Sequence, residues 1–124
     1  MFTSNIFGQE LFNDQKLSVT SDILKYEDQK NDQFYNYYNF TIKNIGSEKQ
    51  KFELIINYNQ NGKDKSSQSL DESLIFELAP EETIVGDINN KRILTLFKSF
   101  LPGNSGKKAS DSFVVIKSIE INYL

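Results

Sequence analysis

The chain has 124 residues, the size of one ordinary domain, and its 38% hydrophobic residues are enough to form a core. It contains no histidine, cysteine or tryptophan, which excludes histidine-based acid–base catalysis, thiol nucleophiles, disulfides and thiolate metal sites. The formal net charge of -3 disfavours a nucleic-acid binder that depends on many phosphate contacts. We therefore expect one domain without catalytic residues, cofactor or metal.

The first residues carry a feature of exported proteins. They lack a positively charged region and are too short for a complete signal peptide. However, Phe7-Gly8-Gln9 is similar to the end of signal peptides from Bacteroidetes bacteria. Residues 1–8 are then a signal-peptide remnant, or alternatively an edge strand of a cytoplasmic protein that starts at Met1, and residues 9–124 are the domain. We expect a periplasmic or secreted protein, and no segment has the roughly 20 apolar residues of a membrane helix.

Three segments in the first half of the chain predict β-strands, because apolar residues recur there at every second position. They are 16–26, 34–45 and 52–58, with a polar loop at 27–33. The third segment shows the most regular alternation, since it is unbroken through Tyr58.

The strand at 34–45 has two different faces. Tyr38, Phe40 and Ile42 form the face that we expect in the core. The opposite face then carries three candidate binding residues, Tyr35, Tyr37 and Asn39. Tyrosine combines apolar area with a hydroxyl group, which suits both protein interfaces and stacking on sugar rings. These residues therefore predict a surface for a protein partner or a carbohydrate.

Turn signals divide the second half of the chain. Asn61-Gly62 predicts a type I′ hairpin, because both central residues of that turn need positive φ, and it leads to an exposed edge at 63–69. Pro80-Glu81-Glu82 predicts a turn before another short strand. Within 112–124 the apolar positions change phase near Lys117-Ser118, which predicts a β-bulge.

Segment 91–101 is ambiguous from its sequence. Its apolar residues gather on one side of a helix. Leu94, Leu96 and Phe100 also fit a strand that Pro102-Gly103 would end. We expect a strand, so the chain has at most one short helix.

Seven or eight short strands without alternating helices predict a mainly β protein, namely a single immunoglobulin-like antiparallel β-sandwich. Four successive motifs resemble small bacterial immunoglobulin-like domains of the FxLYD type: Phe40–Gly46, Phe52–Tyr58, the Asn-Gly hairpin and Leu78–Thr83. Phe52 and Leu54 agree with the family pattern, whereas Ile55 and Ile56 stand where the family has Tyr and Asp. The resemblance implies a sandwich in an exported protein without catalytic residues.

Acidic residues are concentrated in one stretch without a basic residue among them. They are Asp71, Glu72, Glu77, Glu81, Glu82 and Asp87. A patch of one charge can orient a partner of the opposite charge. This pattern would suit a small cytoplasmic immunity-type protein that blocks a basic toxin.

The sequence therefore favours an exported, non-enzymatic interaction domain that binds a protein partner through an aromatic or edge-strand surface. The first alternative is a carbohydrate-binding module that uses Tyr35 and Tyr37. The second is the cytoplasmic immunity-type protein with its acidic patch.

Overall fold

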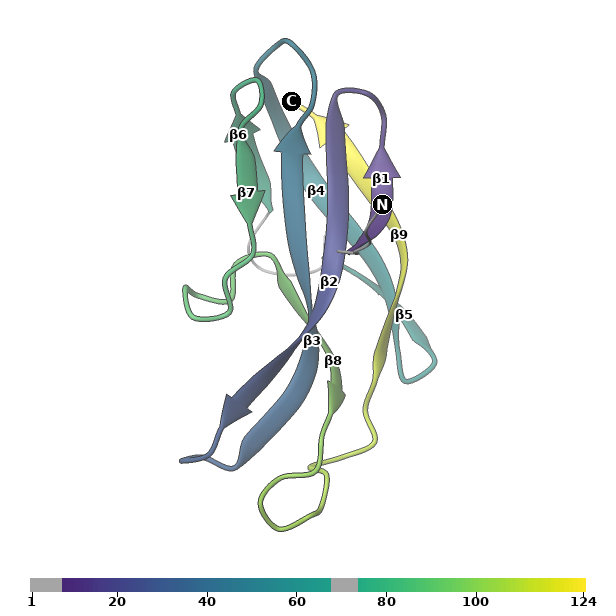
Figure 1. The fold of residues 1–124 in the computed structure, drawn as a ribbon. Coiled ribbons are helices and arrows are strands. Elements are labelled where there is room, and N and C mark those ends of the chain that lie inside the picture. Colours follow the sequence, from purple (N-terminus) through teal and green to yellow (C-terminus); the bar gives the residue numbers. More distant parts are fainter. Residues whose placement is uncertain (1–7, 68–73) are drawn as a thin grey trace, which may run out of the picture.

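The computed structural model describes residues 8–67 and 74–124 (Figure 1). This part of the chain is almost entirely β and contains no α-helix. The strands are β1 (Gln9–Asn13), β2 (Leu17–Asp28), β3 (Gln33–Asn44), β4 (Gln50–Gln60), β5 (Lys63–Ser66), β6 (Ile75–Leu78), β7 (Thr83–Val85), β8 (Thr95–Phe100) and β9 (Val114–Tyr123). Segment 91–101 thus contains a strand, as predicted. Residues 1–7 of the expected signal-peptide remnant or edge strand lie outside the described residues.

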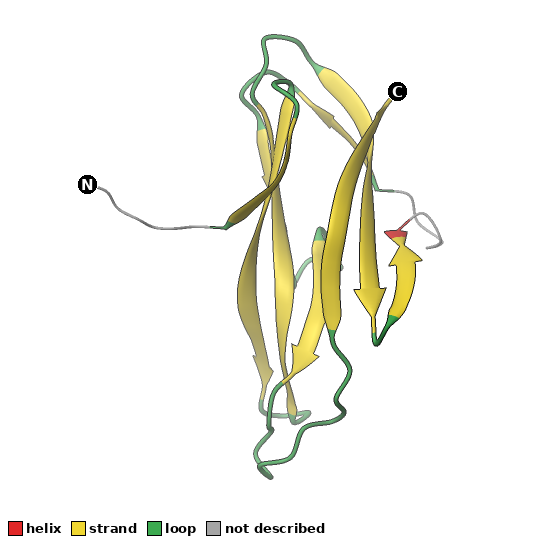
Figure 2. Ribbon diagram, turned by 90° about the vertical axis from the view of Figure 1, so that its right-hand side faces the viewer, coloured by secondary structure: helices red, strands yellow, loops and turns green. Residues whose placement is uncertain are grey.

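Two antiparallel sheets pack face to face and form the predicted β-sandwich (Figure 2). In the first sheet, β1, β2 and β3 are neighbours, and β7 and β8 share the other edge of β3. In the second sheet, β4 pairs with β9 along one edge, while β5 and β6 share the opposite edge. The consecutive strands β3 and β4 are therefore the central strands of different sheets.

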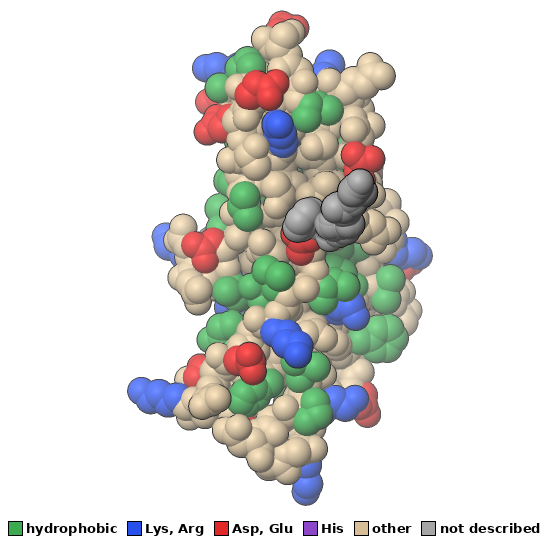
Figure 3. Space-filling model, in the orientation of Figure 1, with side chains coloured by type: hydrophobic (Ala, Val, Ile, Leu, Met, Phe, Trp, Pro, Cys, Tyr) green, Lys and Arg blue, Asp and Glu red, His purple; other side chains and the backbone are tan. Residues whose placement is uncertain are grey.

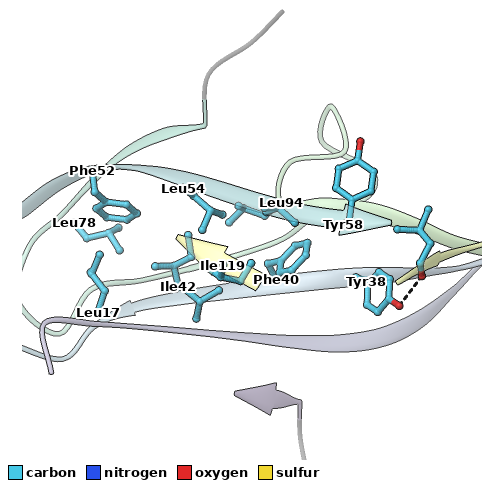
Figure 4. Close-up of a cluster of buried hydrophobic side chains, with 13 residues drawn as sticks. Leu17, Tyr38, Phe40, Ile42, Phe52, Leu54, Tyr58, Leu78, Leu94 and Ile119 are labelled. Atoms are coloured by element: carbon cyan, nitrogen blue, oxygen red, sulfur yellow. Dashed lines mark hydrogen bonds between the residues drawn. The ribbon is translucent and has the colours of Figure 1, made fainter. Parts of the chain in front are cut away.

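The core lies between these two central strands (Figure 4). Phe40 and Ile42 of β3 and Phe52 of β4 are fully buried. Leu54 of β4 is 1% exposed. The hydroxyl of Tyr38 donates a 2.8 Å hydrogen bond to the carbonyl oxygen of Val114, at the start of β9. The alternating residues predicted for the two strands are therefore the ones that fill the core.

The predicted turns and the bulge are present. Asn61 and Gly62 have φ values of 54° and 88°, as a type I′ hairpin requires. Glu82 N–H donates to the carbonyl oxygen of Ala79 at 3.0 Å, which closes the turn before β7. In β9, Ser118 pairs with Asn57 and Ile116 with Tyr58, so Lys117 between them is the extra residue of the bulge.

Candidate functional site

Tyr35, Tyr37 and Asn39 point away from the intersheet core, because they alternate with Tyr38 and Phe40 along β3. They nevertheless do not form an open platform, since only 6–7% of each residue is exposed. Their outer face is covered by side chains from the neighbouring strands and from the loop at 86–94.

An aromatic cluster surrounds Tyr35 on this outer face. Its ring centroid lies 4.9 Å from Tyr26, 5.7 Å from Phe97 and 6.5 Å from Phe100. Tyr26 pairs with Tyr35 across β2 and β3, and Phe100 pairs with Tyr35 across β3 and β8. Aromatic pairs across strands stabilise a sheet. The first sheet therefore has a second, smaller apolar layer on its outer side.

Phe97 and Phe100 share this face because of a bulge in β8. Ser99 pairs with Asn36 and Phe97 with Tyr37, so Lys98 has no pairing partner in β3. The extra residue changes the alternation, and the two phenylalanine rings lie 4.7 Å apart although they are three residues apart in sequence. Spacing by three residues also fits one side of a helix, which explains why this segment is ambiguous from sequence alone.

The aromatic cluster borders a hollow of about 350 Å³. Its lining residues are Gln33, Tyr35, Tyr37, Ile88, Arg92, Thr95, Leu96, Phe97 and Phe100. Figure 3 looks onto this side of the molecule and shows hydrophobic side chains gathered over the lower half of the sheet. We call this feature the aromatic hollow.

Two polar groups of the aromatic hollow, the Tyr35 hydroxyl and the Arg92 guanidinium group, have no hydrogen-bond or ion-pair partner among the described residues. The hydroxyl of Tyr35 is buried and has no hydrogen-bond partner in the described part of the chain. Burial raises the pKa of Tyr35, and the positive charge of Arg92 offsets part of that rise. Arg92 is exposed, and within residues 8–67 and 74–124 no carboxylate lies within ion-pair distance of its guanidinium group. Arg92 is also the only arginine of the chain.

The loop that carries Arg92 is held at both ends by β3. Gly86 N–H donates to the carbonyl oxygen of Phe40 at 2.8 Å, and Phe40 N–H donates to that of Leu94 at 2.9 Å. Lys91, Arg92 and Leu94 have φ values between 51° and 54°, a conformation that costs energy for residues other than glycine. The loop therefore holds a strained backbone in place above the outer face of β3.

The described members of the predicted acidic patch are exposed, and each has an ion-pair or hydrogen-bond partner on the surface. Glu77 forms an ion pair with Lys49 at 3.6 Å, and Glu81 forms one with Lys43 at 3.7 Å. A carboxylate oxygen of Glu82 accepts the N–H of Ala79. The last described member, Asp87, accepts the N–H of Asn89. Asp71 and Glu72 lie outside the described residues.

The predicted exposed edge at 63–69 corresponds to β5 in its described part, and residues 68–69 lie outside it. Lys63, Asp64 and Lys65 are exposed there. Charged side chains along an edge strand disfavour pairing with another strand. The aromatic hollow is therefore a better candidate for binding than this edge.

The described part of the chain offers neither a metal site of clustered acidic side chains nor a membrane-spanning helix. Residues 8–67 and 74–124 contain no cluster of three acidic side chains that could hold a metal ion. No helix in this part of the chain has the length and hydropathy needed to span a membrane.

Comparison with known proteins gave no matching family model, no matching curated protein and no matching solved structure. The aromatic hollow is therefore the main candidate for a functional site in the described residues.

Proposed function

We propose that this chain is an exported, non-enzymatic binding domain that recognises a protein partner through the aromatic hollow. The observation that carries the proposal is the combination of aromatic walls, the buried Tyr35 hydroxyl and Arg92, which has no ion-pair partner in the described part of the chain. Aromatic residues and arginine are the types enriched at the energetic centres of protein interfaces. The similarity of Phe7-Gly8-Gln9 to signal-peptide ends and the likeness to exported immunoglobulin-like domains support the cellular location.

A binding role fits the residues of the aromatic hollow better than a catalytic one. Its lining contains one charged side chain, that of Arg92, and no carboxylate. Acid–base chemistry by paired carboxylates therefore lacks its groups at this place. Stacking on a sugar ring would need an open aromatic face, and the rings of Tyr35 and Tyr37 are almost fully covered.

Affinity purification from native cells tests the proposal. The tagged protein, expressed with its upstream region, is purified from separated envelope, medium and cytoplasm, and partners and the protein's own terminus are identified by mass spectrometry. We expect a stoichiometric protein partner and a terminus near Gln9 in the envelope or medium. Arg92→Glu should release the partner, whereas Lys63→Glu on β5 of the second sheet should retain it.

Other results would contradict the proposal. A partner that binds Arg92→Glu as well as the unchanged protein would exclude the aromatic hollow as its site. Selective binding on a glycan array, lost in the Tyr35→Ala, Tyr37→Ala variant, would favour a carbohydrate-binding module. A cytoplasmic protein that starts at Met1 would overturn the proposed location.

A further inference from the structure

We propose that the aromatic hollow binds the C-terminal end of its partner chain, with the terminal carboxylate held by Arg92 and the last, apolar side chain inserted among the aromatic rings. This inference rests on the proposed function and specifies the chemistry of the partner. Three features of the aromatic hollow support it: its charge, its unused hydroxyl and its size.

The charge of the aromatic hollow favours one carboxylate. Arg92 is the only charged residue in the lining, and its guanidinium group is planar, which suits two parallel hydrogen bonds to a carboxylate. Burial and, after it, the negative charge of Asp87 in the same loop raise the pKa of Tyr37. A ligand with one carboxylate can place it on Arg92, whereas the further carboxylates of an acidic stretch would be repelled by Asp87.

The hydroxyl of Tyr35 provides the second contact. It is one of two buried side-chain polar atoms without a partner in the described part of the chain, and a buried polar group left unpaired destabilises the folded state. Tyr35 and Arg92 both line the aromatic hollow. In the bound state one carboxylate oxygen would accept hydrogen bonds from both groups, and neighbouring side chains would have to make room for it because the hydroxyl of Tyr35 is buried.

The size and apolar walls favour a chain end over an acidic side chain. About 350 Å³ lies at the small end of the range for ligand pockets. A chain that passes through must enter and leave, whereas a chain end needs only one opening. The last residue of a chain also presents an apolar side chain and a carboxylate on the same carbon atom. An aspartate or glutamate side chain offers the carboxylate without the apolar group that the rings of Phe97 and Phe100 would contact.

Short synthetic peptides test this inference with the whole chain in solution. The probes are acetyl-Gly-Ser-Gly-Phe and acetyl-Gly-Ser-Gly-Leu, each as the free acid and as the C-terminal amide, together with acetyl-Gly-Ser-Glu-Gly-amide. Binding is measured by calorimetry and by NMR shifts of the backbone amides. We expect the two acids to bind on the order of tenfold more tightly than their amides, because a hydrogen-bonded charge is lost. The glutamate peptide should bind no better than the amides.

Variants of the chain locate the effect. Arg92→Gln should bind acid and amide equally weakly, and Tyr35→Phe, which keeps the ring, should weaken the acid while leaving the amide unchanged. Lys63→Gln on β5 serves as the matched control for the loss of one positive charge, and it should keep the full preference for the acid. NMR spectra of each variant show whether it remains folded.

The outcomes separate this inference from the proposed function. Equal binding of acids and amides, absence of binding by every acid, or a preference that persists in Arg92→Gln would overturn the inference. If the native protein partner is nevertheless lost with Arg92→Glu, the proposed function stands and the partner uses another group. If neither peptide nor partner depends on Arg92, both proposals are wrong.

Discussion

The hydroxyl of Tyr123 donates a hydrogen bond to carboxylate Oδ2 of Asp14, which joins the last strand of the second sheet to the turn between β1 and β2 of the first. The other carboxylate oxygen of Asp14 accepts the N–H groups of Lys16 and Leu17, each at 2.9 Å. Lys16 Nζ lies 5.0 Å from the centre of the Tyr123 ring. One carboxylate therefore organises a turn and connects the two sheets.

The first prediction concerns the loss of this connection. Tyr123→Phe should lower the free energy of unfolding by about 1 kcal/mol at neutral pH, because it removes one hydrogen bond to a charged group at a partly exposed place. Burial opposes ionisation of Asp14, but its hydrogen bonds outweigh this and lower its pKa below the usual 3.8.

The sign of the pH effect follows from that lowered pKa. The carboxylate's contribution is fully present above the unfolded value of 3.8 and is lost as the pH falls through the folded value. Urea denaturation of both proteins should therefore show the full difference at neutral pH and a smaller one near pH 2. A difference unaffected by Asp14→Asn in a double-mutant cycle would show that the pair is not its source.

The second prediction compares two tyrosine hydroxyls of β3. Tyr38→Phe should lower the free energy of unfolding by about 1–3 kcal/mol, because the buried carbonyl of Val114 loses its donor. Tyr35→Phe should be neutral or slightly stabilising, because its hydroxyl has no partner in the described part of the chain. Urea denaturation measures both. An equal loss in the two variants would mean that the Tyr35 hydroxyl is hydrogen-bonded in solution.

The third prediction concerns Gly86, at the start of the loop that carries Arg92. A Cβ atom added there would lie 2.5 Å from the carbonyl oxygen of Leu94 and would also clash with the side chain of Asn39. Gly86→Ala should therefore lower the free energy of unfolding by about 1–3 kcal/mol and displace the loop. Gly46→Ala is the control, because its Cβ would meet only contacts of 3.6–3.8 Å. Similar thermal stability for both variants would contradict the packing at Gly86.

The fourth prediction concerns alkaline pH. Burial raises the pKa values of Tyr35, Tyr37 and Tyr38 above the usual 10.0. The unfolded chain releases these protons first, so stability is fully present below pH 10 and falls as the pH rises through the folded values. Absorbance titration should show that some of the tyrosine side chains ionise only when the protein unfolds at alkaline pH. Ionisation of all six tyrosines near the usual value in the folded protein would contradict this burial.

The sequence predicted the sandwich because its strands follow strict alternation and its turns have specific residues. Asn61 and Gly62 mark their hairpin unambiguously, and the change of phase at Lys117 locates the bulge in β9. Alternation also assigned Tyr35 and Tyr37 to the outer face of β3. It could not tell that this face is covered, since part of the cover comes from a loop about 50 residues further along the chain, which includes Arg92. Alternation also could not place Phe97 and Phe100 on this face, because the bulge at Lys98 breaks the two-residue period on which the prediction depends.

Both faces of β3 are packed against other parts of the protein, and this fixes the length of the strand. Tyr38, Phe40 and Ile42 serve the core, while Tyr35, Tyr37 and Asn39 face the aromatic hollow and its loop. Insertion or deletion of a single residue within β3 would exchange the two sets, sending aromatic hydroxyls into the core and core residues toward Arg92. An insertion or deletion that leaves both sets in place must therefore fall in the turns at either end of β3, at 29–32 and 45–49.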